Sequence, residues 1–202
     1  MIVAVATNNA KKLAEIQRIL DHLGHTAKTL KELGIATEIE ETGTTFCENA
    51  IIKAKTICEI CHMPTISDDS GLEVDALGGA PGVYTARYAG ENPTDGENID
   101  KLLANLQGVP QEKRTARFVS AVCLYLPKGE HIECLGRCEG WIGFEKIGEG
   151  GFGYDPIFMV GDTSYSQMTN DEKDRISHRG IALAQLQDQM AEFMAKSAIK
   201  ID

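Results

Sequence analysis

The order of apolar patterns at the amino-terminal end is the feature that most constrains the fold of this chain. Residues 2–6 form a short apolar run typical of a buried strand, and residues 7–9 interrupt it. Residues 26–30 predict a second, weaker strand, and Gly24 before them is a residue favoured at helix ends. Between the two strands, helical spacing relates Leu13, Ile16, Leu20 and Leu23. A strand, a helix and a further strand in this order indicate an α/β fold.

A second helix is predicted to begin after Thr45, which forms a capping-box pattern with Glu48. Its apolar spacing is carried by Phe46, Ile51, Ala54, Ile57 and Cys61. Residues 65–67 then indicate a brief strand that ends in Asp68-Asp69, and residues 72–75 indicate another strand after a turn. This alternation extends the α/β pattern.

The second half of the chain changes character. Thr94 and Glu97 form another capping-box pattern, which opens a helix through residue 106. Residues 114–126 and 131–142 resemble the two strands of a hairpin. The last predicted helix has an apolar side made of Leu183, Leu186, Met190 and Phe193. We therefore predict an α/β fold with a mixed, twisted sheet flanked by helices, and one domain over residues 1–202, without an internal boundary that the sequence marks.

Charge and hydropathy exclude several classes of function. The 202 residues carry a net charge of −10, and no basic stripe offsets it, which argues against binding of a nucleic acid polymer. No apolar run is long enough to cross a membrane, and the first residues lack the pattern of a signal peptide. These observations predict a cytoplasmic protein without a membrane partner. A small anionic substrate is compatible with the charge if a cation accompanies it.

The six cysteines allow two interpretations. Cys58 and Cys61 have the spacing of a redox pair, and together with Cys134 and Cys138 they imitate a four-thiolate zinc site. However, Cys58 and Cys61 fall late in a predicted helix, where thiolates are not stabilised. Cys134 and Cys138 are separated by an even number of strand residues and share a face. We therefore favour reduced cysteines that serve as small apolar residues.

Carboxylates gather at two places. Asp68 and Asp69 follow a short apolar strand within the sequence Ser-Asp-Asp-Ser-Gly, and Glu40 and Glu41 lie in a turn-rich segment before the second helix. Hard oxygen ligands suit Mg²⁺, which typically takes one or two protein carboxylates. The alternative is a solvated turn, because Asp, Ser and Gly are also common turn residues.

Three further segments are candidates for nucleotide contacts. Residues 7–12 lie at a predicted helix N-terminus, where free N–H groups favour an anion, although simple capping by Asn explains them equally well. Residues 150–156 combine glycines with aromatic rings, as in a base-binding loop or an ordinary anchored loop. Residues 177–180, with Lys173 upstream, resemble an exposed cationic cluster before the final helix, and entry into that helix with solvated charges is the alternative. Cations for phosphate, carboxylates for Mg²⁺ and an aromatic loop for a base together describe a nucleotide site.

Several long motifs, in the same order, resemble those of the inosine/xanthosine triphosphate pyrophosphatases. These are TNNAKK at residues 7–12, ETGTTFCENA at residues 41–50, SDDSGLEVDALGGAPGVYTARY at residues 67–88, GFGYDPIF at residues 151–158 and SHRG at residues 177–180. The resemblance implies elongated α/β subunits with two lobes, a nucleotide cleft between them, and a homodimer. It also implies magnesium-dependent hydrolysis of inosine, deoxyinosine or xanthosine triphosphate to the monophosphate and pyrophosphate.

The resemblance also assigns residues. Asp69 is the expected catalytic carboxylate and metal ligand, with Glu40 or Glu41 as the second source of a ligand. Lys12 is the expected main cationic contact of the triphosphate. The full expected set of substrate-binding residues is Thr7, Asn8, Asn9, Ala10, Lys11, Lys12, Lys53, Ser70, Phe152, Gly153, Tyr154, Asp155, Lys173, His178 and Arg179.

The expected reaction is attack of water on the α-phosphorus with pyrophosphate as the leaving group. Asp69 would hold the metal ion and either orient or deprotonate the water. Donors such as Arg179, His178 or backbone N–H groups would select a 6-oxo purine over adenine. Two other functions fit the same residues: a nucleotide sensor without catalysis, and a phosphatase that removes the terminal phosphate.

Overall fold

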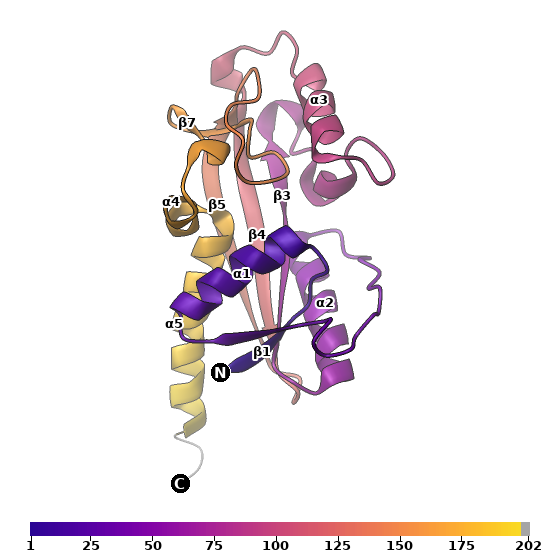
Figure 1. Cartoon of the computed structure of the whole chain (residues 1–202), viewed down its shortest axis with the longest axis vertical. Helices are drawn as coiled ribbons and strands as arrows, with labels where there is room; N and C mark the ends of the chain where they lie inside the picture. Colours follow the sequence, from indigo (N-terminus) through magenta and orange to yellow (C-terminus); the bar gives the residue numbers. More distant parts are fainter. Residues whose placement is uncertain (199–202) are drawn as a thin grey trace. The chain divides into compact units, whose positions relative to one another are not determined.

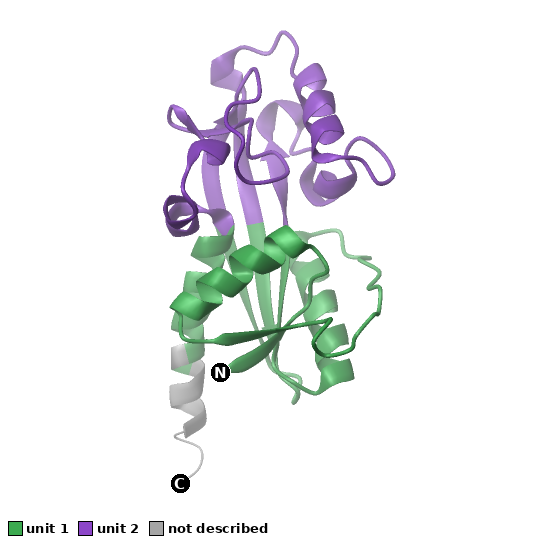
Figure 2. Ribbon diagram, viewed as in Figure 1, with its two compact units in different colours: residues 1–69, 120–136, 179–202 green, residues 70–119, 137–178 purple. Residues whose placement is uncertain are grey.

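A computed structural model describes residues 1–198; the side chains of residue 191 and residues 193–198 lie outside that description, and with them the predicted core position Phe193. The chain divides into two compact units (Figure 2). Unit 1 contains Met1–Asp69, Ser120–Gly136 and Arg179–Asp202, and unit 2 contains Ser70–Val119 and Arg137–His178. Each unit is therefore assembled from segments that are distant in the sequence.

The strands form one sheet of mixed direction, in the order β2-β1-β3-β4-β5-β6-β7 (Figure 1). Strand β1 pairs in parallel with β2 and β3, whereas β6 pairs antiparallel with β5 and β7. The strand bounds are β1 Ile2–Val5, β2 Thr26–Thr29, β3 Thr65–Val74, β4 Thr115–Tyr125, β5 His131–Ile142, β6 Phe158–Val160 and β7 Thr163–Ser164. The predicted α/β class with a mixed sheet is confirmed.

In unit 1, helices cover both faces of the sheet (Figure 1). The helices are α1 Ala10–His22, α2 Phe46–Cys61 and α5 His178–Ala198, whose first residue still belongs to unit 2. Val3 and Val5 pack with apolar residues of α1 and α5, whereas Ala4 and Ala6 pack with Ile57 of α2. Because alternate strand residues point to opposite faces, α1 and α5 lie on one face of β1 and α2 on the other.

The helix signals of the amino-terminal half are confirmed. Asn9 caps α1, and Gly24 follows its end with a φ of +74°, a conformation that glycine adopts readily. Thr45 and Glu48 form the complete capping box of α2. Capping satisfies N–H groups at a helix end that have no partner within the helix, so local chemistry fixes where these helices begin.

The predicted acidic turn is wrong, because residues 65–74 form the single strand β3. Ile66 belongs to the apolar cluster shared with α1 and α5, whereas the Ser67 hydroxyl donates to the backbone oxygen of Ala50 in α2. By the same alternation, Asp68 points to the α1 side and Asp69 to the α2 side. A turn would expose the carboxylates to water; a strand is compatible with them here because cations from both sides neutralise them.

Unit 2 has its own apolar core and contains the helices α3 Asp95–Asn105 and α4 Asn170–Ile176. The capping box of Thr94 and Glu97 opens α3 as predicted. Strands β6 and β7 and helix α4 were not predicted, because elements of two to seven residues are too short to show a period. Short 3₁₀ helices occur at Asp75–Leu77, Gly82–Arg87, Gln111–Lys113 and Tyr165–Gln167.

The predicted hairpin of β4 and β5 is confirmed, since the strands are neighbours and Leu126 N–H donates to the oxygen of Glu130 across the turn. Within residues 1–198, no helix combines the length and the hydropathy needed to span a membrane. The six cysteines are free thiols, and Cys134 and Cys138 are both buried from β5, as their spacing predicts. Burial raises the pKa of Cys134 to about 11 and that of Cys123 to about 12.

Candidate functional site

Asp68 is the centre of a buried ion network in unit 1. Its Oδ2 lies 3.0 Å from Lys12 Nζ in α1 and 3.0 Å from Arg179 Nη2 in α5. The Ser120 hydroxyl of β4 donates to Oδ1, and Arg179 also pairs with Glu15 of α1. Burial by itself would raise the pKa of Asp68, but the charges of Arg179 and Lys12 outweigh it and hold the pKa well below its usual range. Asp68 is therefore a carboxylate that ties α1, α5 and β4 to β3.

The predicted exposed cationic cluster before the final helix is wrong on two counts. Lys173, His178 and Arg179 are all buried, at 5%, 5% and 1% exposure. His178 and Arg179 also lie in the first turn of α5 and do not precede it. A sequence pattern predicts that an isolated cation is exposed, because burial of an unpaired charge is costly. Lys173 and Arg179 are buried because carboxylates from distant segments of the chain pair with them.

Asp69 faces a different set of partners, on the α2 side. Its Oδ1 lies 2.9 Å from Lys53 Nζ, and its Oδ2 accepts from Asn49 Nδ2 at 3.3 Å. The same Lys53 Nζ lies 3.0 Å from Glu41 Oε1. One ammonium is thus shared by two carboxylates, and the group of Glu41, Lys53 and Asp69 carries one net negative charge.

Charge sharing explains the ionisation of this group. Burial raises the pKa of Asp69 by more than the attraction of Lys53 and Lys12 lowers it, and repulsion from Glu41 adds to the rise. For Lys53, burial lowers the pKa but the two carboxylates outweigh it, so its pKa is raised. The two adjacent aspartates therefore differ: the pKa of Asp69 is raised, whereas that of Asp68 is lowered.

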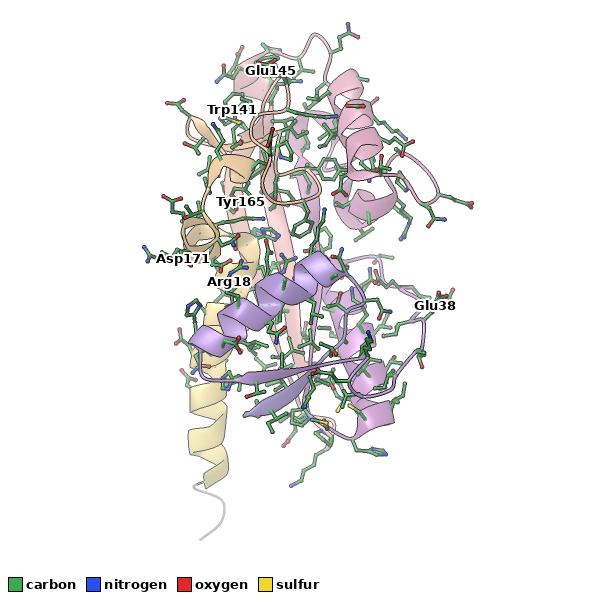
Figure 3. All side chains as sticks on the ribbon, viewed as in Figure 1. Arg18, Glu38, Trp141, Glu145, Tyr165 and Asp171 are labelled. Carbon is green, nitrogen blue, oxygen red and sulfur yellow. The ribbon has the colours of Figure 1, made fainter. Side chains whose placement is uncertain are left out.

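The connection between β2 and α2 brings Glu41 to this group. Gly43 N–H donates to Asn49 Oδ1 at 2.8 Å, and a Cβ at Gly43 would lie 2.6 Å from that oxygen, so only glycine fits. Figure 3 labels Glu38 on the same connection. Glu40 is exposed and makes none of the contacts described for Glu41. The two glutamates that the sequence could not separate are thus distinguished by position: Glu41 is the one beside Lys53.

Residues 7–12 form the β1–α1 junction. Asn9 Oδ1 accepts from the N–H groups of Lys11 and Lys12 at 3.0 and 3.1 Å, and Asn9 N–H donates to the Thr7 hydroxyl. The predicted capping of the helix by Asn is thus confirmed. Asn8, Asn9, Ala10 and Lys11 are exposed. Lys12 is the residue of this segment that reaches a buried carboxylate.

Unit 2 contains a second buried ion pair. Lys173 Nζ lies 2.7 Å from Asp155 Oδ2, and the same oxygen accepts from Phe152 N–H at 2.8 Å. Lys173 Nζ also lies 5.1 Å from the centroid of the Phe152 ring, within cation–π range. A Cβ at Gly151 would collide with the Asp155 carboxylate, and its φ is +73°. Asp155 therefore fixes the glycine loop to α4.

The two aromatic residues of this loop have different roles. Tyr154 is 2% exposed, belongs to the unit 2 core and donates its hydroxyl to the oxygen of Thr85. Phe152 is only half-buried. The interpretation of an aromatic that anchors the loop thus applies to Tyr154, whereas Phe152 stays partly exposed. Gly153 N–H donates to Asp95 at 2.9 Å.

His178 and Ser70 complete the predicted set in unit 2. The His178 ring stacks on Phe118 with centroids 4.8 Å apart, and Phe118 also stacks on Tyr165, which Figure 3 labels. Ser70 follows Asp69 directly in β3 and is half-buried. The ring of His178 is thereby held in one plane by aromatic packing.

Three residues of the networks were missed by sequence reasoning. They are Glu15, Ser120 and Asn49. Asn49 and Lys53 are four residues apart on the buried face of α2, and Glu15 lies three residues after Lys12 on α1, so a search for polar residues on apolar helix faces would have found them. Ser120 carries no such signal, because a small hydroxyl in a strand is common.

The donor set of unit 1 fits a divalent cation. Asp69 and Glu41 supply hard oxygen atoms on either side of one ammonium, and the group lacks one positive charge. Within residues 1–198 no cluster of three or more His, Cys, Asp or Glu side chains is placed to hold a metal. Two carboxylates are nevertheless the usual protein contribution to Mg²⁺, since water and phosphate complete its shell.

Comparison with known proteins finds relatives along almost the whole chain. The dITP/XTP pyrophosphatase of Bacillus subtilis (strain 168) is 49% identical over 184 residues, which are 90% of this chain and 93% of that protein. The dITP/XTP pyrophosphatase of Exiguobacterium sibiricum is 46% identical over 198 residues, 97% of this chain and all of that protein. These relatives agree with the motif resemblance.

Solved structures share the fold at similar coverage. The Staphylococcus aureus Ham1 protein superposes with a TM-score of 0.84 at 40% identity, over 95% of this chain and 99% of that one. A HAM1 protein from Coxiella burnetii gives 0.85 at 41% identity, over the same shares. The model of the Ham1 family matches residues 3–189. This span includes the ion network of Asp68, the group of Glu41, Lys53 and Asp69, and the glycine loop of unit 2. Sequence, fold and motif order agree, and the chain belongs to the Ham1 family.

Proposed function

We propose that this protein hydrolyses non-canonical purine nucleoside triphosphates (dITP, ITP and XTP) to the monophosphate and pyrophosphate, with Mg²⁺ as cofactor. The observation that carries the proposal is the group of Glu41, Lys53 and Asp69. It joins a carboxylate of raised pKa to a second carboxylate and a cation, in a chain 49% identical to a dITP/XTP pyrophosphatase. Such a group suits a metal-assisted attack on phosphate.

In the proposed mechanism, Asp69 and Glu41 would hold the metal, and Asp69 would also orient or deprotonate the attacking water. Asp69 suits this role because a carboxylate is both a hard oxygen ligand and a proton acceptor. When bound, Mg²⁺ would offset the charge on the phosphate oxygens and lower the pKa of a coordinated water.

Lys12 is the proposed main cationic contact of the triphosphate, with Thr7, Asn8, Asn9, Ala10 and Lys11 around it. Lys12 is positioned at the first turn of α1, where the helix dipole also favours an anion. The Lys12 side chain is 18% exposed, and Asp68 would retain Arg179 when Lys12 turns to a phosphate. Lys12 is therefore able to leave Asp68 without leaving a buried charge unpaired.

In the proposed nucleoside site, Phe152 is a stacking surface, and His178 and backbone N–H groups are hydrogen-bond donors. The other residues that would surround the nucleoside are Ser70, Gly153, Tyr154, Asp155 and Lys173. A 6-oxo purine presents an acceptor where adenine presents an amine, so fixed donors discriminate against adenine. Arg179 uses three donors on Asp68 and Glu15, so its predicted contact with the base requires a rearrangement of that network.

One assay distinguishes the proposed activity from the two alternatives. Purified protein is incubated with dITP and Mg²⁺, and the products are separated and identified. The proposal expects dIMP and pyrophosphate; dIDP and orthophosphate would indicate a terminal phosphatase, and bound but unchanged dITP would indicate a sensor. The same assay with XTP, ATP and GTP measures base preference.

Paired variants test the metal ligands. Glu41→Gln and Glu40→Gln make the same chemical change at adjacent positions, and only Glu41 contacts Lys53. We expect Glu41→Gln to raise the Mg²⁺ concentration required for half-maximal activity and Glu40→Gln to leave it unchanged. Equal effects of the two substitutions would contradict the assignment of Glu41.

We also propose the homodimer that the family resemblance implies. Sedimentation of the purified protein measures it directly, and a monomer at micromolar concentration would argue against it. The cytoplasmic location stays a prediction from the sequence.

A further inference from the structure

Lys53 lies where a cation bound by Asp69 and Glu41 would lie. Its Nζ is 2.9 Å from Asp69 Oδ1 and 3.0 Å from Glu41 Oε1, so a single positive charge bridges the two carboxylates. The second oxygen of Asp69 accepts from Asn49 Nδ2. Both oxygens of Asp69 thus have partners within the protein before any ligand arrives.

A divalent ion and an ammonium compete for these oxygens. An ion that coordinates both carboxylates has to come within a few ångströms of Nζ, where two positive charges repel each other strongly in a partly buried site. Lys53 has a flexible four-carbon side chain with a compact charge, so it can move aside if another anion receives it. A triphosphate supplies that anion.

We propose that Lys53 is a placeholder cation: it neutralises Asp69 and Glu41 in the ligand-free protein and is transferred to a phosphate oxygen when metal and nucleotide bind together. This inference rests on the proposed function and adds a coupling to it. Metal alone would bind weakly because it would displace Lys53 from the two carboxylates that it contacts, whereas metal with nucleotide would bind tightly because a phosphate receives the ammonium. Lys53 is thus a positioning residue that links the two ligands.

This coupling predicts that removal of the Lys53 ammonium strengthens the binding of metal alone and weakens the binding of metal with nucleotide. In Lys53→Met the two carboxylates lose their internal cation, so we expect Mn²⁺ alone, as a spectroscopic substitute for Mg²⁺, to bind at least about tenfold more tightly than to the unmodified protein. The same variant lacks the ammonium that would meet the phosphate, so its affinity for the Mn²⁺ complex of a non-hydrolysable α,β-imido analogue of dITP should fall.

The measurement is titration of free Mn²⁺ by electron paramagnetic resonance in the absence of nucleotide, followed by titration of the analogue. Lys55→Met is the matched control, since Lys55 lies on the same helix, pairs with Glu59 at 4.0 Å and has 52% of its side chain exposed. It should leave both affinities unchanged. Lys53→Arg keeps the cation and should retain weak binding of Mn²⁺ alone.

Folding of each variant is checked by circular dichroism, and Lys53→Gln serves as a second neutral variant if Lys53→Met does not fold. Equal or weaker binding of Mn²⁺ alone to a folded neutral variant would overturn the inference, even if the unmodified protein hydrolyses dITP. If no variant binds Mn²⁺ and activity persists in the presence of a chelator, the metal part of the proposed function fails as well. The product assay and the Mn²⁺ titration therefore distinguish the two failures.

Discussion

Asp68 and Asp69 are adjacent in β3, yet replacement of Asp68 with Asn should affect stability and replacement of Asp69 with Asn should affect turnover. Asp68 points to Lys12 and Arg179, and Asp69 points to Lys53. We expect Asp68→Asn to destabilise the protein, and Asp69→Asn to reduce turnover strongly with little effect on stability. The contrast follows from the alternation of side chains along a strand.

The expected loss in the free energy of unfolding for Asp68→Asn follows from the burial of the Asp68 side chain. The Asp68 side chain has no exposed surface, and the substitution removes one carboxylate from Arg179 while Glu15 stays paired with it. Removal of one partner from a buried ion pair typically costs about 3–5 kcal/mol. Because Glu15 remains and Lys12 reaches water, we expect the lower end, about 3 kcal/mol. For a chain of this length, that loss lowers the melting temperature by about 6–12 °C.

Asp69→Asn should change the free energy of unfolding by no more than about 1 kcal/mol. Lys53 keeps Glu41 as a partner, and the substitution removes a carboxylate whose burial is unfavourable. Turnover of dITP should fall about 100-fold or more, because the proposed base and metal ligand is lost.

Urea unfolding and steady-state release of pyrophosphate are measured for both variants and for Asp162→Asn. Asp162 is an exposed aspartate between β6 and β7, so this control should match the unmodified protein in both assays. An unfolding free energy of Asp68→Asn within about 0.5 kcal/mol of the control would refute the ion-network argument. Normal turnover in a folded Asp69→Asn protein would refute the catalytic assignment.

Two further predictions concern other parts of the fold. Gly151→Ala should lower the free energy of unfolding by more than Gly153→Ala, because a Cβ at Gly151 would collide with Asp155, whereas Gly153 has open space around its Cβ and should cost only about 1–2 kcal/mol of backbone strain; urea unfolding measures both losses, and equal losses would contradict this. Burial raises the pKa of Cys123 to about 12 and of Cys134 to about 11, so above pH 9 the unfolded thiols ionise first and stability should fall as the pH rises; urea unfolding at pH 8 and pH 10 measures this, and a double Cys→Ala variant should show a smaller fall.

The sequence by itself determined the features that depend on local chemistry. Asn9 and the pair of Thr45 and Glu48 mark helix starts because their side chains satisfy N–H groups within the same turn. The apolar periods of α1 and α2, the hairpin of β4 and β5, and the α/β class follow for the same reason: each depends on neighbours a few residues away. The order of the motifs was also sufficient to indicate the family, which the matches over residues 3–189 show.

Only the tertiary structure decided the state of the charged residues. Asp68 and Asp69 look alike in sequence, and a turn was the reasonable prediction for them, because two adjacent carboxylates are costly in a strand unless cations reach them. Those cations come from α1, α2 and α5, which are 16 to 111 residues away from their partners in β3. Glu41 is likewise distinguished from Glu40 only by its contact with Lys53. Local patterns cannot specify contacts over such separations, because they depend on how the helices pack on the two faces of the sheet.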